Sequence, residues 1–241
     1  MRPARRDIAL IQLLPNAMTL GAICAGVTAM RMAFSGAFDT AVALLFLAAL
    51  LDGLDGSVAR ALKSESLIGA ELDSLADVVN FGVAPAIILY FWTLWQDPVT
   101  GWIAALVYIV CCALRLARFN VGAKDDTADR RFFTGVPSPA GALLALAPLF
   151  LTHAFPGAEH PAWASAIWMV MCGFLMVSRL PTWSLKARIP QRFARTVLVF
   201  LAMSGALLIT WPWVTLLGFD LLYLAAIPLA VRHSRIAPSK D

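Results

Sequence analysis

Long apolar segments separated by short polar ones make up most of the chain. They lie near residues 15–34, 38–58, 68–95, 101–119, 138–155, 162–178, 196–210 and 212–231. A helix needs about 20 residues to cross the hydrocarbon core of a bilayer, and all but the seventh segment come close to that length. The pattern predicts an all-α, polytopic helical membrane protein with about eight transmembrane helices, six being the alternative.

The same pattern predicts one membrane domain over residues 1–241, because no repeat or long linker interrupts it. At residues 1–14, basic positions precede a short aliphatic run that stops at Pro15. This favours a retained interfacial amphipathic helix over a cleaved signal peptide. We expect a helical bundle at 15–195, two accessory spans at 196–231 and a tail at 232–241.

Composition and charge agree with a membrane protein and orient it. Of 241 residues, 60% are hydrophobic and 14% are charged, which lies outside the usual range of soluble domains. If the N-terminus is cytoplasmic, eight spans place every Lys and Arg except Arg31 on or near the cytoplasmic side, in accord with the positive-inside rule. The net charge of +4 favours anionic lipid surfaces, and no basic-aromatic pattern indicates nucleic acid.

Four aspartates interrupt the second and third apolar segments: Asp52, Asp55, Asp73 and Asp77. Each carboxylate near a bilayer centre costs about 2.5–3.5 kcal/mol, so protons or bound metal must neutralise the group. Steps of three and four residues place each pair on one helix face, and residues 61–68 allow a turn between two antiparallel helices. All-carboxylate sites suit Mg²⁺ or Mn²⁺. A purely structural ion site, or an ion path, is the alternative interpretation.

Two glycines and an arginine accompany the aspartates. Gly56 and Gly69 let a ligand approach closely, and Arg60 offers a planar cation suited to phosphate. The complete string is Asp52-x-x-Asp55-Gly56-x-x-Ala59-Arg60, then eight residues, then Gly69-x-x-x-Asp73-x-x-x-Asp77. It resembles the signature of the CDP-alcohol phosphotransferases and matches that signature at every position. The resemblance implies two divalent cations, Mg²⁺ or Mn²⁺, bound by the four aspartates beside a pyrophosphate.

Strings outside the signature resemble the membrane-integral phosphatidylserine synthase branch of that family. They lie at 72–77, 81–85, 115–120, 133–139 and 178–181. The resemblance implies that a phosphatidyl group passes from CDP-diacylglycerol to L-serine, giving phosphatidylserine and CMP, in a homodimer. From the distribution of Lys and Arg, we expect the site to face the cytoplasm, in the bacterial inner membrane. Glycerol 3-phosphate, inositol phosphate or choline as acceptor is the alternative within this chemistry. A cation transporter is the alternative from another class.

The resemblance also implies roles for individual residues. Asp77 is expected to be the catalytic residue that takes the proton of the acceptor hydroxyl. The expected nucleotide-binding residues are Asn16, Thr19, Gly56, Ala59, Arg60, Gly69 and Asp73.

A second basic group lies at the end of the fourth apolar segment. Arg115 and Arg118 are three residues apart on one helix face, so both can point at one anion. With Asn120 they are candidates for binding the lipid phosphate or the serine carboxylate, and a positive-inside flank is an equally good interpretation. Arg179 and Lys186 are weaker candidates.

Overall fold

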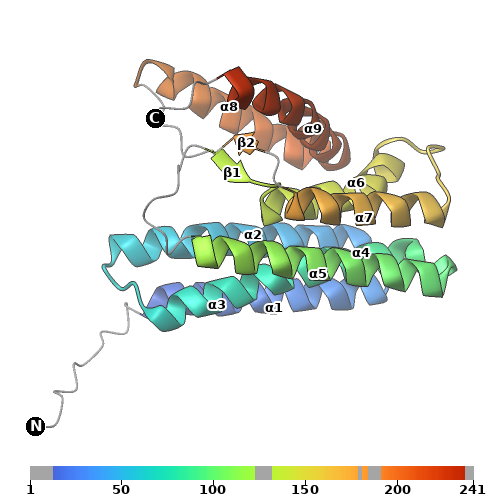
Figure 1. The fold of residues 1–241 in the computed structure, drawn as a ribbon, viewed down its shortest axis with the longest axis horizontal. Coiled ribbons are helices and arrows are strands. Elements are labelled where there is room, and N and C mark those ends of the chain that lie inside the picture. Colours follow the sequence, from blue (N-terminus) through green and yellow to red (C-terminus); the bar gives the residue numbers. More distant parts are fainter. Residues whose placement is uncertain (1–12, 123–131, 179–180, 184–190, 237–241) are drawn as a thin grey trace, which may run out of the picture. The chain divides into compact units, whose positions relative to one another are not determined.

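A computed structural model describes residues 13–122, 132–178, 181–183 and 191–236 (Figure 1). Backbone contacts divide the chain into two compact units, Met1–Trp92 and Thr93–Asp241. Helices build both units, and a pair of three-residue strands in the second is the departure from helix within the described residues. The all-helical fold expected from the hydrophobic pattern is thus confirmed in its main feature.

The first unit contains α1 (Leu14–Phe34), α2 (Phe38–Ala61), α3 (Leu67–Asp77), the π-helical segment η2 (Val78–Val83) and α4 (Ala84–Trp92). The helix α1 packs along α2 and also contacts α3, η2 and α4. Its buried face carries small residues, among them Ala22, Gly26 and Ala29. Small residues let helix backbones approach closely in a membrane, where packing rather than hydrophobicity drives association.

The predicted hairpin of aspartate-bearing helices is present: α2 and α3 are antiparallel and are joined by a short connection (Figure 1). The connection turns through Lys63, whose φ of 50° is left-handed. It ends at Ser66, whose Oγ accepts a hydrogen bond of 3.0 Å from the Gly69 N–H and caps the first turn of α3. A serine at this position satisfies an N–H group that has no partner within the helix.

The third apolar segment differs from a regular helix at its centre. The chain passes from α3 through η2 into α4, so six residues adopt the wider π-helical winding. Pro85, at the start of α4, supplies a physical cause: it has no N–H to donate, and its ring displaces the carbonyl one turn earlier. Hydrophobic periodicity does not reveal a change of winding over six residues, so this feature is missing from the sequence prediction.

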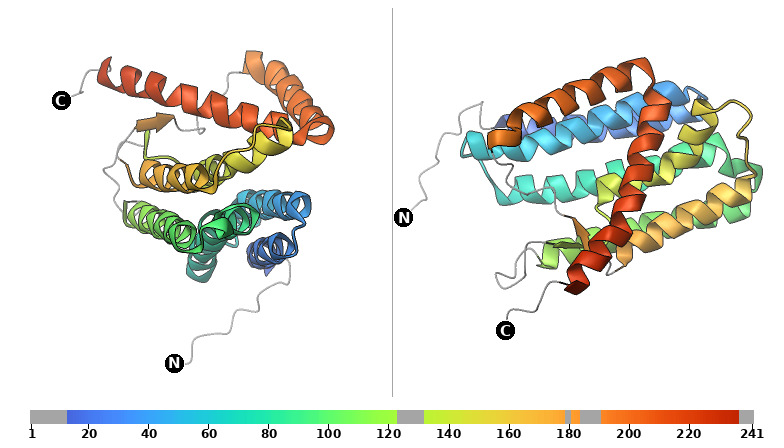
Figure 2. Two further views of the ribbon diagram at one scale, coloured as in Figure 1. Left: turned by 90° about the vertical axis from the view of Figure 1, so that its right-hand side faces the viewer. Right: turned by 90° about the horizontal axis from the view of Figure 1, so that it is seen from above.

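The second unit contains η3 (Leu94–Gln96), α5 (Pro98–Gly122), α6 (Ser138–Ala154), α7 (Ala162–Val177), α8 (Gln191–Thr210) and α9 (Pro212–Ile236). Two views in Figure 2 show these helices from further sides. In α7, Gly173 lies against the α5 backbone, where an added Cβ would stand 3.3 Å from the Tyr108 Cα. Trp168 donates to the Leu144 carbonyl at 2.6 Å and so ties α7 to α6. The rings of Phe150 and Trp213, 6.0 Å apart, join α6 to α9.

A short antiparallel sheet connects the loops of this unit. β1 (Phe132–Thr134) pairs with β2 (Pro181–Trp183), with Phe132 opposite Trp183 and Thr134 opposite Pro181. The sheet brings the segment before α6 beside the segment after α7. Neither strand was expected from the sequence, because three residues are too few to show a period of two.

Five helices in the described residues are long and apolar enough to cross a membrane. They are Leu14–Phe34, Phe38–Ala61, Leu67–Trp92, Pro98–Gly122 and Pro212–Leu229. The other predicted spans are also helical, but their apolar parts are shorter, at Ser138–Ala154, Ala162–Val177 and Thr196–Thr210. The count of eight spans stays a prediction. The expected interfacial helix falls mainly on residues 1–12, outside the described part, as does the end of the tail.

Candidate functional site

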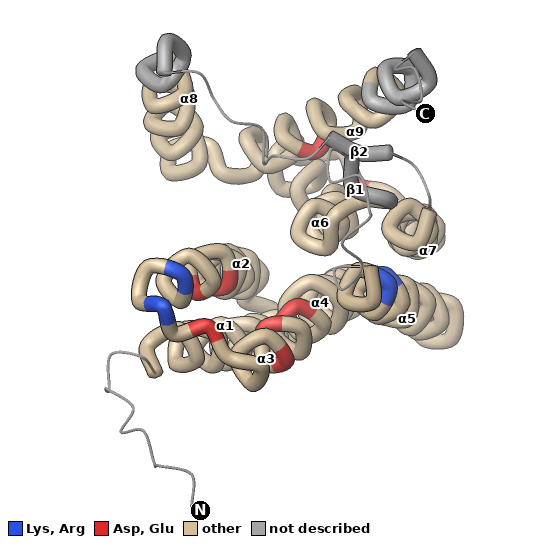
Figure 3. The backbone as a smooth tube through the Cα atoms, turned by 60° about the vertical axis from the view of Figure 1, so that its left-hand side comes forward, with Lys and Arg blue, Asp and Glu red and all other residues tan. Residues whose placement is uncertain are grey.

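The structure brings the four signature aspartates together within the first unit. Asp52 on α2 interacts electrostatically with Asp77, Asp73 and Asp55, and a side-chain hydrogen bond joins it to Asp77. Asp55 is buried, with 4% of its surface exposed. In Figure 3 the acidic positions of α2 and α3 are red, and the basic positions at the connection between them are blue. The helix hairpin therefore gathers carboxylates from two helices, as the spacing predicts.

The oxygen atoms of this cluster fit a hard cation. Asp52 Oδ1 is buried and has no hydrogen-bond partner among the described residues. The hydrogen bond between the Asp52 and Asp77 carboxyl groups needs a positive charge or a proton between them. In the described part of the chain, no three acidic, histidine or cysteine side chains stand in an arrangement that could hold one ion. The donor chemistry therefore fits Mg²⁺ or Mn²⁺, whereas the side-chain positions do not form a finished coordination shell.

A hydrogen bond from α1 orients one of the carboxylates. The Thr19 hydroxyl, only 3% exposed, lies within hydrogen-bond reach of Asp55 Oδ2 and of the Pro15 carbonyl. A hydroxyl has one proton to donate, so a carboxylate, the stronger acceptor, takes it. Thr19 was expected to contact the nucleotide. Its observed contact gives it an additional role in fixing the direction of the Asp55 side chain.

A cavity of about 260 Å³ opens beside the carboxylates. Its lining comes from the first unit only and consists of Pro15, Asn16, Thr19, Asp55, Gly56, Ala59, Arg60, Ser64, Glu65, Ser66, Gly69, Ala70 and Asp73. All the residues expected to bind nucleotide line it. Sequence reasoning missed Pro15, Ser64, Glu65, Ser66 and Ala70, although the helix-capping pattern around Ser66 was a usable signal.

The two signature glycines have different surroundings. A Cβ on Gly69 would stand 2.9 Å from Asn16 Oδ1 and 3.1 Å from Ser66 Oγ, so the absence of a side chain lets Asn16 pack against α3. A Cβ on Gly56 would have Arg60 Nη1 as its nearest neighbour, at 3.7 Å. Gly69 therefore allows two helices to meet, whereas Gly56 leaves space on the cavity side.

Arg60 places a permanent cation in the lining of this cavity. Its Nη2 donates to Ser57 Oγ at 3.2 Å, one turn earlier on α2, which steadies the exposed side chain. A guanidinium has five N–H donors in a fixed plane, so this contact leaves donors for an oxyanion. Close to carboxylates that suit a cation, such a group is appropriate for a pyrophosphate.

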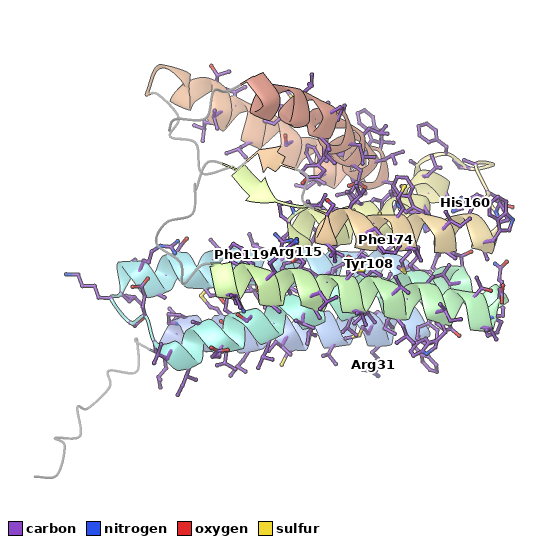
Figure 4. The ribbon with its side chains drawn as sticks, in the orientation of Figure 1. Arg31, Tyr108, Arg115, Phe119, His160 and Phe174 are labelled. Atoms are coloured by element: carbon purple, nitrogen blue, oxygen red, sulfur yellow. The ribbon has the colours of Figure 1, made fainter. Side chains whose placement is uncertain are left out.

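The second basic group lies in the other unit, where Arg115 and Arg118 hydrogen-bond to residues of that same unit. Arg115 is 7% exposed, and its Nε and Nη1 donate to the Val136 carbonyl and to Ser138 Oγ, both at 2.6 Å. Figure 4 labels Arg115 on α5. Arg118 donates to the Ser178 carbonyl at 3.3 Å. Arg115 therefore fastens the start of α6 to α5. Asn120 follows near the end of α5, and Arg179 and Lys186 fall outside the described residues.

Helices long and apolar enough to cross a membrane, together with a cavity beside clustered carboxylates, indicate an integral membrane protein with a site for a charged ligand. A model of the CDP-alcohol phosphatidyltransferases matches residues 12–176. The chain therefore belongs to the CDP-alcohol phosphatidyltransferase family of enzymes, whose members generally depend on divalent cations.

Related bacterial proteins match nearly the whole chain. A CDP-diacylglycerol–serine O-phosphatidyltransferase of Mycobacterium leprae is 42% identical over 239 residues, which cover 97% of this chain and 79% of the relative. One of Mycobacterium tuberculosis is 41% identical, covering 97% of this chain and 83% of the relative. One of Helicobacter pylori is 37% identical, covering 80% and 81%. The family resemblance drawn from the motif is thus confirmed.

Proposed function

We propose that this protein transfers the phosphatidyl group of CDP-diacylglycerol to the hydroxyl of L-serine, giving phosphatidylserine and CMP. The observation that carries the proposal is the cavity in which Asn16, Arg60 and both signature glycines meet beside the carboxylate cluster. The names of the similar proteins support serine as the acceptor.

The cavity binds the CMP part of the lipid substrate. Arg60 contacts the pyrophosphate through its planar N–H groups. Asn16 and Thr19 from α1, with Gly56, Ala59, Gly69 and Asp73 from the hairpin, surround the nucleotide. The diacylglycerol chains extend into the bilayer, where apolar surface is favourable.

The reaction is a displacement at the phosphorus that carries diacylglycerol. The serine hydroxyl oxygen forms a bond to this phosphorus, the bond to the oxygen of CMP breaks, and the hydroxyl proton passes to Asp77. Two divalent cations, Mg²⁺ or Mn²⁺, held by Asp52, Asp55, Asp73 and Asp77, would supply positive charge for the pyrophosphate and the leaving group. The chain itself contributes to the reaction by positioning these groups: Thr19 orients Asp55, and the hairpin of α2 and α3 holds the four aspartates together.

The basic residues of the second unit are proposed to bind the lipid phosphate or the serine carboxylate. Arg115 and Arg118 lie on one face of α5 with Asn120 close by in sequence. The hydrogen bonds of Arg115 to the start of α6 support a pre-organised guanidinium, because its plane is already fixed.

We further propose eight transmembrane spans with the cavity facing the cytoplasm of the bacterial inner membrane, in a homodimer. The eight helical segments and the distribution of Lys and Arg support this topology. The whole of residues 1–241 then forms one membrane domain, in which 196–231 are accessory spans.

The test measures CMP release by the purified protein in detergent with CDP-diacylglycerol, L-serine and Mn²⁺ or Mg²⁺. Parallel reactions contain glycerol 3-phosphate, inositol phosphate or choline, and Asp77→Asn is the control. We expect release that requires serine and metal and is lost in the variant. Release with a different alcohol alone would replace serine as the acceptor. No CMP release with any alcohol would contradict the proposed transferase activity. The carboxylates would then be interpreted as a structural ion site or an ion path.

A further inference from the structure

A buried carboxamide lies three residues after the proposed catalytic residue. Asn80, in η2, has 0% of its surface exposed, and neither Oδ1 nor Nδ2 has a hydrogen-bond partner among the residues that the structure describes. An unsatisfied polar side chain inside a membrane helix is costly. An apolar residue of similar size would avoid that cost, so the amide at this position calls for an explanation.

The carboxamide of Asn80 lies against the backbone of α1. A Cβ built on Gly26 would overlap Asn80 Oδ1 and would stand 3.2 Å from its Cγ and 3.8 Å from its Cα. Only a residue without a side chain allows this approach. Gly26 and Asn80 are therefore matched in shape, and the contact fixes η2 against α1.

The helix α1 uses one face to contact α2, which carries Asp55, and η2, which directly follows Asp77. Thr19 bonds to Asp55 on α2, and Gly26, seven residues later, is on the same face about two turns further along. There it meets Asn80, which follows Asp77 by three residues. The contact thus lies about one turn beyond the hydrogen-bonded pair of Asp77 and Asp52.

The backbone between Asp77 and this contact has unusual winding. η2 starts at Val78, immediately after Asp77. π-helical turns widen the helix, cost stability and occur frequently at functional sites. A wider turn rotates the helix before it relative to the helix after it. The contact that fixes η2 therefore also sets the direction in which the Asp77 side chain points.

We propose that Asn80 is a positioning residue for Asp77: packed on Gly26, it fixes the π-helical turn and holds the Asp77 carboxyl group against Asp52. The proposal rests on the proposed function, in which Asp77 takes the proton of the acceptor. Asn80 itself does not touch substrate.

The test compares Gly26→Ala, Asn80→Ala and the double variant, with Gly21→Ala as matched control. Gly21 is on the same helix, and an added Cβ there meets only Leu51 Cδ1 at an ordinary 3.6 Å. Each variant is measured for kcat and KM in CMP release and for Tm. We expect Gly26→Ala to lower kcat about 100-fold with KM within about twofold, as for a catalytic group displaced by about 1 Å.

The double variant provides the decisive comparison. Asn80→Ala alone lowers kcat about tenfold. In the double variant the methyl group added at position 26 fills the space that the carboxamide has vacated, so kcat rises at least about tenfold above that of Gly26→Ala. Gly21→Ala keeps the kcat of the unchanged protein.

Two outcomes would overturn the proposal. One is variants whose Tm falls while the kcat of the folded protein is unchanged, because this is what a purely structural contact gives. The other is a double variant no more active than Gly26→Ala. Asn80→Ala introduces no clash, so it decides the question even if Gly26→Ala does not fold. Failure of the proposed function is distinguishable, because the unchanged protein would then release no CMP.

Discussion

Two glycines of α2 differ in one respect: one lines the cavity and the other does not. Gly53 and Gly56 are three residues apart on one helix, and a Cβ on Gly53 would meet no atom within 4 Å. A Cβ on Gly56 meets only Arg60 Nη1, at 3.7 Å, yet Gly56 lines the cavity. Neither position requires glycine for packing. Gly56, unlike Gly53, lines the cavity, so a ligand bound there would meet a methyl group added at Gly56.

We therefore expect Gly56→Ala to raise the KM for CDP-diacylglycerol about tenfold or more, because the methyl group occupies ligand space. Gly53→Ala leaves KM unchanged. Both variants keep or slightly raise Tm, because alanine stabilises a helix by about 0.5–1 kcal/mol relative to glycine. Steady-state CMP release and thermal unfolding in detergent measure the two quantities. Equal KM values for both variants would show that the ligand does not reach Gly56.

Thr19 is a second position at which one atom can be tested. Thr19→Val keeps the shape and removes the proton donated to Asp55. Groups that orient metal ligands typically contribute about 10–100-fold to affinity or activity. We expect Thr19→Val to weaken Mn²⁺ binding and to lower CMP release by that factor, with Thr19→Ser near the unchanged protein. Mn²⁺ titration followed by electron paramagnetic resonance gives the binding constant. Unchanged Mn²⁺ binding in Thr19→Val would limit Thr19 to the nucleotide.

At the scale of helix packing, the hydrogen bonds of α5 indicate that Arg115 contributes to the stability of the protein and that Arg118 does not. Arg115 makes two short hydrogen bonds to the segment that starts α6, whereas exposed Arg118 makes one long one. Lysine has no planar fork, so it cannot reproduce both bonds of Arg115.

Arg115→Lys should accordingly destabilise the protein by about 2–4 kcal/mol, seen as a lower Tm, because it leaves buried acceptors without donors. Arg118→Lys serves as the matched control and leaves Tm within error. Thermal unfolding followed by tryptophan fluorescence compares them. A normal Tm for Arg115→Lys combined with a raised KM would assign Arg115 to phosphate binding alone.

The hairpin of α2 and α3 was predictable, whereas its supports were not. Spacing placed each pair of aspartates on one face, and a polar stretch marked the turn, which local rules describe well. The bond from Thr19 to Asp55 joins residues 36 apart in sequence, and no periodicity encodes such a contact. The π-helical turn was missed because hydrophobic periodicity does not reveal a change of winding over six residues. The sequence does not show that the Asn80 amide is buried without a hydrogen-bond partner among the described residues, because burial depends on the packing of distant segments.

At the scale of the whole molecule, each of the eight predicted apolar segments is helical in the part of the chain that the structure describes, but crossing a membrane is a separate property. In the described part, the apolar helices of three predicted spans have 15 to 17 residues, at Ser138–Ala154, Ala162–Val177 and Thr196–Thr210. Such lengths lie at or below the range of about 17–25 residues for a span. Tilt, bilayer thinning or a re-entrant pair can accommodate them.

Labelling of single cysteines in a variant without the four native cysteines tests the topology. Eight spans place Ser35→Cys and Trp211→Cys on the outer side and Glu65→Cys on the cytoplasmic side, and all three positions are exposed. We expect a membrane-impermeant thiol reagent to label the first two in intact cells and the third only in inverted vesicles. Labelling of Trp211→Cys from the cytoplasmic side would show that α8 and α9 do not both span.

The position of the cavity in the chain has a consequence for biosynthesis. All its lining residues lie between Pro15 and Asp73, and their helices are inserted before the second unit is synthesised. The nascent chain therefore contains every residue that lines the cavity before the second unit is synthesised. A ligand that binds this cavity stabilises the helix pairing that forms it, so CDP-diacylglycerol is expected to favour the hairpin of α2 and α3 over other pairings while the remaining helices are synthesised.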